Sequence, residues 1–204
     1  VGHKGISCFI VEKGWDGFET GTPENKLGIR ASDTCELYFD NVKVSVDNLI
    51  GNEGEGFKIA LATLDGGRIG IAAQALGIAQ ASLNASVSYS KERIQFGKPI
   101  STYQAIQFKI ADMTMEIEAA RLLIRQAAWK KDQKQSYSHV ASMAKVYASE
   151  VAMRASTQCV QIHGGFGYMR EAGVERLMRD AKITQIYEGT SEIQRVVIAR
   201  SVLK

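Results

Sequence analysis

The sequence lacks long apolar runs and is poor in cysteine, proline and histidine. No apolar stretch approaches the roughly 20 residues that would span a bilayer, so we expect no membrane span. The three cysteines, Cys8, Cys35 and Cys159, are odd in number and have no CxxC spacing, which favours reduced thiols over a disulfide framework. The three histidines share no metal-ligand spacing, and we predict no bound metal.

An excess of one charge is also lacking. The 204 residues include 25 Lys and Arg against 22 Asp and Glu, and the basic residues are spread among the acidic ones, so we expect no nucleic-acid partner. A length of 204 residues with a hydrophobic content of 45% is enough for a substantial core, and fits either one domain or a domain plus an appendage. The first residues contain neither an initiator Met nor a leader, and strand-like sequence follows at once. We therefore expect the chain to be part of a longer protein.

Two patterns meet near residue 51. Residues 5–12 and 34–44 are short, rich in β-branched and aromatic residues, and separated by turn signals, which predicts strands. After this point the apolar spacing becomes helical. The clearest series recurs in steps of four and three, at Ile106, Ile110, Met113, Ile117, Ala120, Ile124 and Ala127.

The helical part is predicted to form a bundle. One helix is expected over about residues 55–91, which at 1.5 Å per residue would be about 55 Å long. A third helix follows the series above and ends at the glycine cluster 164–167, and a last helix begins after Ser191. Capping boxes are expected at Asn52 with Glu55 and at Ser101 with Gln104. The fold class predicted is mainly α, an antiparallel four-helix bundle preceded by a β-domain fragment.

A carboxylate stands beside a glycine immediately before the last helix. Gly189 has no Cβ, so a ligand can approach the backbone of Glu188 closely, and the hydroxyls and amides that follow favour an anion. This stretch admits two interpretations: a site for a catalytic base, or an ordinary capping box of Ser191 with Gln194. The glycine cluster 164–167 follows a helix and lacks GxGxxG spacing, which excludes a Rossmann fingerprint.

Four motifs in order resemble those of the acyl-CoA dehydrogenases. They are LDGGR at residues 64–68, RIQFGKPI at 93–100, QIHGGFGY at 161–168 and IYEGT at 186–190. The resemblance covers essentially the whole chain. It implies that residues 1–50 are the last portion of that family's β-barrel-like middle domain and that residues 51–204 are its C-terminal helical bundle domain.

The resemblance implies FAD-dependent α,β-dehydrogenation of an acyl-CoA thioester to a trans-2-enoyl-CoA. Glu188 would be the base that removes the α-proton, and its backbone N–H would bind the thioester oxygen together with a ribityl hydroxyl of FAD. Gly189 would leave room for the substrate. Some members place the base just before the arginine of the first motif, where this chain has Gly67, and a glycine cannot be a base. The glycine at position 67 and the carboxylate at position 188 therefore both indicate that the base is Glu188.

The resemblance also assigns substrate and cofactor contacts. Asp65 and Arg68 would line the thioester end of the pocket, although an i, i+3 ion pair is the alternative. Arg93 would reach the FAD pyrophosphate of a neighbouring subunit, where a guanidinium suits phosphate, or else pair with Glu92.

The remaining cofactor assignments carry alternatives of their own. Phe96 would pack beside the adenosine, or only pin a turn. Gln104 would contact the flavin, or complete its capping box. Further FAD contacts across a dimer interface, or a helix C-cap in their place, are Gln161, Gly164 and Gly165. Thr190 and Glu192 would contact the flavin from the subunit that carries the base.

The family context implies an oxidoreductase and flavoprotein of fatty acid β-oxidation and lipid metabolism. Its partners would be acyl-CoA, further copies of the chain in a dimer or dimer of dimers (a homotetramer), and an electron-transfer flavoprotein as electron acceptor. The motifs are most like short-chain, butyryl-type members, and the compartment would be bacterial cytoplasm or mitochondrial matrix.

Two other functions stay open: a flavoprotein acyl-CoA oxidase, and a non-catalytic helical oligomerisation or scaffold domain of the same fold. Because the upstream half of the family's flavin pocket is not in this chain, we expect the chain alone to be less than fully competent and to bind FAD weakly or not at all. Flavin absorbance of the purified chain tests this expectation.

Overall fold

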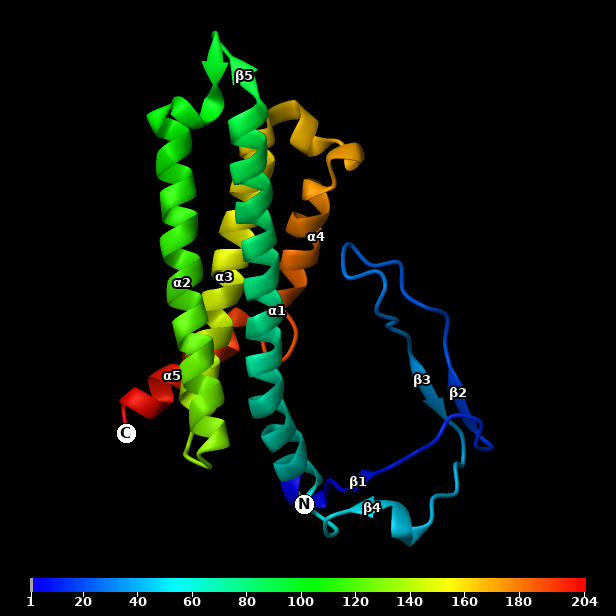
Figure 1. Ribbon diagram of the computed structural model, residues 1–204. Coiled ribbons are helices and arrows are strands. Elements are labelled where there is room, and N and C mark those ends of the chain that lie inside the picture. The colour runs from blue at the N-terminus through cyan, green and yellow to red at the C-terminus, as the bar shows by residue number, and fades with distance from the viewer. Residues whose placement is uncertain (1) are drawn as a thin grey trace. The chain divides into compact units, whose positions relative to one another are not determined.

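The computed structural model describes residues 2–204 and divides into two compact units (Figure 1). The first unit extends to Leu64 and the second begins at Asp65, so the boundary falls inside the longest helix. Each unit is described by itself.

The first unit contains short strands and 3-10 turns. Strand β1 (Cys8–Phe9) pairs antiparallel with β4 (Leu49–Ile50), and β2 (Phe18–Thr20) pairs antiparallel with β3 (Leu37–Phe39). Two 3-10 turns, η1 (Gly2–Gly5) and η2 (Val46–Asn48), complete it. The predicted strands at residues 5–12 and 34–44 are therefore present only as the two- and three-residue segments β1 and β3. Two-stranded pairs with exposed side chains have little core to extend them.

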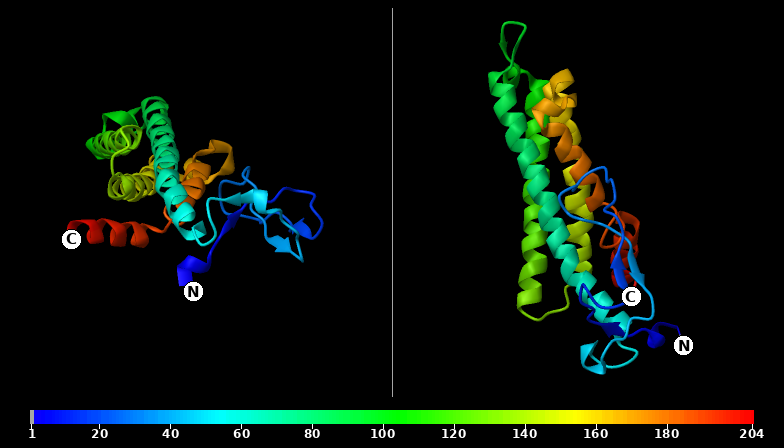
Figure 2. Two further views of the ribbon diagram at one scale, coloured as in Figure 1. Left: turned by 90° about the horizontal axis from the view of Figure 1, so that it is seen from below. Right: turned by 90° about the vertical axis from the view of Figure 1, so that its right-hand side faces the viewer.

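The second unit is built from antiparallel helices. Helix α1 (Gly56–Glu92) is followed by a hairpin of β5 (Ile94–Gln95) and β6 (Lys98–Pro99), the turn η3 (Ile100–Thr102) and helix α2 (Gln104–Asp132). The chain continues through α3 (Ser138–His163), η4 (Gly164–Tyr168), η5 (Arg170–Ala172), α4 (Val174–Thr184) and α5 (Ser191–Val202). Figure 2 shows α1 to α4 side by side, with α5 set across them. The prediction of a mainly helical chain with an antiparallel bundle is confirmed.

The core of the bundle is rich in alanine. The α2 series predicted from its spacing is buried from Met113 to Ala127, and it packs in one cluster with alanines of α1 and α3. Those alanines are Ala72, Ala75, Ala79, Ala141, Ala144, Ala148, Ala152 and Ala155. Small side chains allow the backbones of these helices to approach one another closely, so the core is densely packed.

Helix α4 was not predicted, and two of the predicted capping boxes are wrong. The predicted cap Ser101 lies inside the preceding 3-10 turn, and the N-cap residue of α2 is Tyr103 instead. Tyr103 makes no side-chain capping hydrogen bond. Thr190 is the N-cap residue of α5, and its hydroxyl accepts from the Ile193 N–H. At the first helix, Glu55 accepts from the N–H and the side-chain amide of Asn52, which is one half of a capping box.

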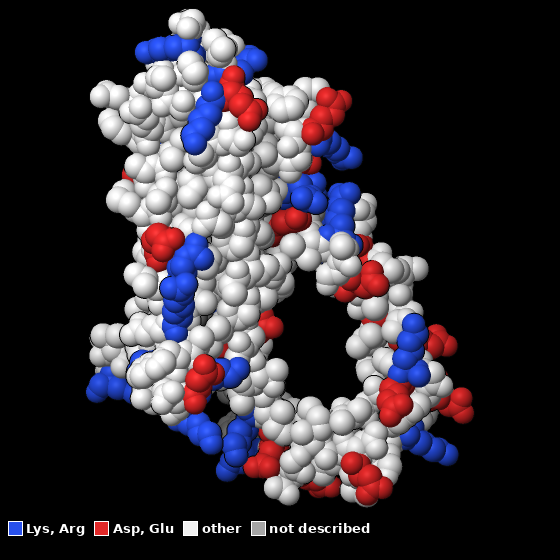
Figure 3. All heavy atoms as spheres, viewed as in Figure 1, with Lys and Arg blue, Asp and Glu red and all other residues white. Residues whose placement is uncertain are grey.

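The surface carries both signs of charge. Lys and Arg side chains are interspersed with Asp and Glu over the face in Figure 3, with wide uncharged areas between them. No helix within residues 2–204 is both long and apolar enough to cross a membrane. The same part of the chain holds no group of three or more His, Cys, Asp or Glu side chains that could bind a metal ion.

Candidate active site

Glu188 lies in a tight turn between α4 and α5. We call residues 186–190 the Glu188 turn. The Ser191 N–H donates to the Gln185 carbonyl oxygen at 2.9 Å and closes this turn. Glu188 has a φ of +54° and Gly189 a φ of +88°, so two consecutive residues are left-handed. A left-handed conformation costs a residue other than glycine about 1–2 kcal/mol, and surrounding contacts must offset that cost.

The Glu188 carboxylate packs against the bare backbone of Gly67 on α1. A Cβ built on Gly67 would lie 2.5 Å from Glu188 Oε2 and 2.9 Å from Oε1, closer than atoms of this kind approach. Oε2 is buried and has no hydrogen-bond partner among the described residues. The two positions from which the family resemblance supplies a base are therefore adjacent in space, and only Glu188 carries a carboxylate.

The buried Arg68 forms an ion pair with the half-buried Asp65, one helical turn before it on α1. Arg68 Nη1 donates to Asp65 Oδ1 at 2.5 Å and to Ser142 Oγ at 3.4 Å, and Ser138 Oγ donates to the same Asp65 oxygen. The i, i+3 ion pair left open by the sequence is thus formed. Arg68 is 6% exposed and its Nε has no partner within residues 2–204. A role for either residue in substrate binding stays a prediction.

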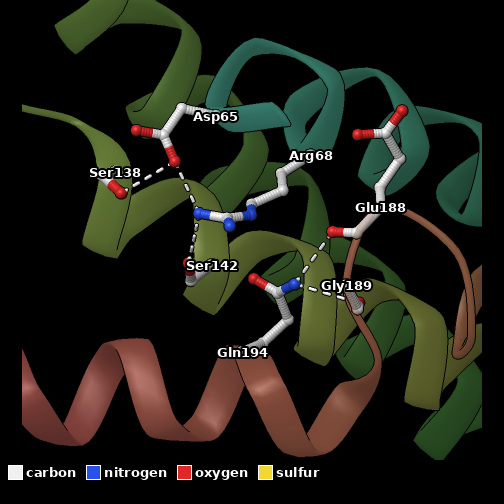
Figure 4. A network of polar contacts seen from close by, with 7 residues as sticks. All are labelled: Asp65, Arg68, Ser138, Ser142, Glu188, Gly189 and Gln194. Carbon is white, nitrogen blue, oxygen red and sulfur yellow. Dashed lines mark hydrogen bonds and ion pairs between the residues drawn. The ribbon is translucent and has the colours of Figure 1, made fainter. Parts of the chain in front are cut away.

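Figure 4 shows how this network relates to the Glu188 turn. The carboxylate of Glu188 points away from Arg68, whereas the carbonyl oxygens of Glu188 and Gly189 point toward Gln194 of α5. Gln194 Nε2 donates to these two carbonyl oxygens at 3.1 and 3.0 Å. The prediction that Gln194 completes a capping box with Ser191 is wrong, because its amide binds the backbone of the turn.

Lys145 of α3 binds the same turn. Its Nζ donates to the Gly189 carbonyl oxygen at 2.7 Å, and the side chain has no exposed surface. Burial, followed by repulsion from Arg68, lowers the pKa of Lys145 to about 8, against the attraction of Glu192, Glu150 and Glu188. The sequence analysis missed Lys145. The signal available was a single cation among the alanines and serines of 141–149, which are typical of a closely packed helix face.

Tyr187 connects the turn to α1. Its hydroxyl donates to Gln74 Oε1 at 2.5 Å, about two helical turns beyond Gly67. Burial raises the pKa of Tyr187, and the Gln74 hydrogen bond opposes this effect. Side chains of α1, α3 and α5 thus contact the Glu188 turn from three directions.

The predicted cofactor residues fall into two groups. The first group comprises Arg93, Phe96, Gln104, Gln161, Gly164 and Gly165. Three of these residues, Arg93, Gly164 and Gly165, line a groove of about 700 Å³. Both glycines are exposed, and nothing lies within 4 Å of a Cβ built on either one. The stacked rings of Tyr89, His163 and Phe166 form one wall of the groove. This groove offers a cation, exposed backbone and aromatic surface together.

Three other members of the first group do not line this groove. Phe96 is 93% exposed at the tip of the β5–β6 hairpin and has a φ of +53°. Gln104 is exposed as the first residue of α2, and Gln161 is exposed near the end of α3. Arg93 forms no ion pair with Glu92 within the described chain, and Glu92 accepts a hydrogen bond from Ser88.

The second group lies at the start of α5. Thr190 and Glu192 line a smaller hollow of about 260 Å³ together with Lys182 and Gln185. Hydrogen bonds from its own backbone N–H and from Thr190 lower the pKa of the exposed Glu192 carboxyl. In Figure 1 the β5–β6 hairpin is at one end of the bundle and α5 is toward the other.

The structure is an antiparallel helical bundle in which a buried carboxylate oxygen of Glu188, unpaired among the described residues, lies against a helix glycine, so the class that it defines is a helical domain with a candidate catalytic base. A family model described as acyl-CoA dehydrogenase, C-terminal domain, matches residues 54–203. The chain belongs to the acyl-CoA dehydrogenase family.

Individual relatives are close in sequence and structure. The chain is 56% identical over 203 residues to the short-chain-specific acyl-CoA dehydrogenase of Megasphaera elsdenii, covering 100% of this chain and 53% of that protein. The structure of butyryl-CoA dehydrogenase from Megasphaera elsdenii superposes with a TM-score of 0.98 at 56% identity, over 100% of this chain and 53% of that one. A chain from a study of the electron transferring flavoprotein of Acidaminococcus fermentans gives the same TM-score, identity and coverage. The chain thus spans about half the length of these relatives.

Proposed function

We propose that the full-length protein carrying this chain is an acyl-CoA dehydrogenase that oxidises an acyl-CoA thioester to a trans-2-enoyl-CoA. Glu188 would remove the α-proton, and FAD, when bound, would supply the acceptor for the β-hydride. The observation that carries this proposal is the Glu188 carboxylate, which lies against Gly67 with a buried, unpaired Oε2. A buried carboxylate oxygen without a hydrogen-bond partner destabilises the protein. A proton taken from the substrate would remove its charge and so relieve this cost.

The backbone of Glu188 supplies the second catalytic element. Its N–H donates no hydrogen bond to any residue from 2 to 204, so it is free to bind the thioester oxygen. A donor fixed at this oxygen stabilises the negative charge that develops as the α-proton leaves. The left-handed conformation sets the direction of both the N–H and the carboxylate, and Gly189 adds no side chain beside them. Asp65 and Arg68 would line the thioester end of this pocket.

The residues of the first group fit FAD. Arg93 offers a guanidinium for the pyrophosphate, and Gly164 and Gly165 allow its close approach to the backbone. Bound FAD would accept the hydride from the substrate's β-carbon. Phe96, Gln104 and Gln161 would add adenosine and flavin contacts, and Thr190 and Glu192 would contact the cofactor near the base.

The spacing of these groups supports a homo-oligomer. Gly67, which contacts Glu188, and Arg93, which follows α1, are 26 residues apart along a continuous helix, a distance of about 39 Å. One extended dinucleotide does not span this distance. A single chain would therefore contribute its two groups to different FAD molecules, and each cofactor would be shared between subunits.

Helix α2 carries an apolar stripe that supports the same conclusion. Four large side chains recur every seven residues on its exposed side, Phe108, Met115, Leu122 and Trp129, and each is between 56% and 64% exposed. Residues seven apart share a helix face, and an apolar stripe of this length is typical of an interface with another helix. We assign it to contacts between subunits of a dimer or dimer of dimers.

The wider role is proposed from the family. Residues 1–50 would belong to a middle β-domain and residues 51–204 to the helical domain. The full-length enzyme would act in fatty acid β-oxidation in bacterial cytoplasm or mitochondrial matrix, with an electron-transfer flavoprotein as acceptor. The short-chain-specific and butyryl-CoA relatives favour a short acyl chain.

The experiment is turnover of the full-length protein with acyl-CoA substrates of increasing length and a dye acceptor. We expect dye reduction with a short-chain optimum and little hydrogen peroxide. Rapid peroxide formation without dye would instead identify an acyl-CoA oxidase. Absence of turnover with every acyl-CoA from FAD-loaded protein would favour the scaffold function and contradict the proposal.

A further inference from the structure

Lys145 is the largest side chain in the described chain that is completely buried. It lies on α3 between Ala144 and Ala148, positions that belong to the alanine-rich core. Its ammonium group donates to the Gly189 carbonyl oxygen at 2.7 Å. A charged lysine is seldom fully buried, because removal from water costs several kcal/mol per ion.

The Glu188 turn needs external contacts to keep its conformation. Glu188 and Gly189 are both left-handed, and the carbonyl oxygens of these residues point into the bundle rather than along a helix. Gln194 donates to both oxygens, and Lys145 donates a second hydrogen bond to that of Gly189. Without such donors, each buried carbonyl group would lower the stability of the folded protein by about 1–3 kcal/mol.

We propose that Lys145 is a positioning residue for Glu188: its ammonium group binds the Gly189 carbonyl oxygen and fixes the turn that aims the Glu188 carboxylate at Gly67. This inference rests on the proposed function, in which Glu188 is the base. Lys145 acts through the peptide backbone and does not touch the substrate.

The charge distribution favours this role over packing alone. A methionine of similar length would fill the same space without the cost of burying a charge, so packing does not require a lysine here. Arg68 repels the ammonium group, and Glu188, Glu150 and Glu192 attract it. The lysine thus sits among carboxylates near the turn, with its charge directed at a backbone oxygen.

The experiment compares Lys145→Met with wild type in the full-length, FAD-loaded enzyme. Anaerobic rapid mixing with butyryl-CoA gives the rate constant of flavin reduction, and titration gives the substrate dissociation constant. We expect the rate constant to fall about 100-fold, as for a base misplaced by about 1 Å, while the dissociation constant changes less than about threefold. Lys109→Met on α2 is the matched control, because Lys109 binds Gln158 away from the turn. It should reduce flavin at the wild-type rate.

Three outcomes decide the inference. A folded Lys145→Met enzyme with a wild-type rate constant overturns it, and so does a variant that loses substrate affinity as strongly as rate. If Lys145→Met does not retain FAD, Lys145→Gln, whose shorter side chain places no charge at the Gly189 carbonyl oxygen, is measured instead and must show the same rate-selective loss; a wild-type rate in that variant also overturns the inference. Glu188→Gln separates this inference from the proposed function, since wild-type flavin reduction in Glu188→Gln would refute the base assignment itself.

Discussion

Replacing Gly67 by alanine should damage catalysis without destabilising the protein. The new Cβ would lie 2.5 Å from Glu188 Oε2, whereas ordinary contacts of this kind begin at 3.4 Å, so the carboxylate must move by about 0.9 Å. The atoms displaced belong to the end of a flexible side chain and not to the backbone. Folding is therefore expected to tolerate the change, whereas the position of the Glu188 carboxylate relative to the substrate is expected to be disturbed.

The two effects have separable magnitudes. Alanine in place of glycine inside a helix stabilises it by about 1 kcal/mol, which should leave the melting temperature unchanged or slightly raised. A misplacement near 1 Å is expected to slow proton abstraction about 100-fold, or ~2.7 kcal/mol in activation free energy. The assay is anaerobic flavin reduction by butyryl-CoA in the full-length enzyme, with the melting temperature measured on the same samples.

Gly77→Ala is the matched control for this prediction. Gly77 lies on the same helix, and nothing is within 4 Å of a Cβ built on it. It should gain the same helix stability and keep the wild-type rate. If Gly67→Ala also keeps the wild-type rate with normal substrate affinity, the contact between Gly67 and Glu188 is irrelevant to catalysis and the reasoning is refuted.

Three further predictions concern stability, cofactor and assembly. Because the pKa of Lys145 is lowered from 10.5 to about 8, the cost of its buried charge is fully present below pH 8 and is lost as the pH rises toward 10.5. Chemical denaturation should show wild type gaining up to roughly 3 kcal/mol relative to Lys145→Met across this window, and parallel pH profiles would contradict this. Arg93→Gln should raise the FAD dissociation constant of the full-length enzyme about tenfold or more, as measured by fluorescence titration, and unchanged affinity would exclude the phosphate contact. Leu122→Glu places a charge in the α2 stripe and should lower the mass measured by light scattering, whereas an unchanged mass would place the subunit interface elsewhere.

The helices could largely be predicted from the sequence because their apolar residues recur at helical spacing. The long helix and the α2 series are confirmed almost to the residue. Helix α4 was not predicted although Val174, Leu177 and Ala181 have the same spacing, because three apolar positions in an 11-residue helix give a short periodic signal. The strands were overestimated, since β-branched composition does not show whether a partner strand and a core are present.

The active site was only partly predictable. The motif around Glu188 and the glycine at position 67 were visible in the sequence, but their contact joins residues far apart in the chain and needs the folded structure. The roles of Lys145 and Gln194 depend on a left-handed turn whose carbonyl groups point inward, which no residue pattern specifies. Local capping rules assigned Gln194 to the wrong partner for this reason.

The most direct measurement of the central claim is flavin reduction in Glu188→Gln. The amide is nearly the same size as the carboxylate, so the full-length variant should bind FAD and butyryl-CoA normally. Because an amide cannot accept the α-proton, we predict no flavin bleaching on the time scale of wild-type turnover. Bleaching at the wild-type rate would contradict the assignment of Glu188 as the base.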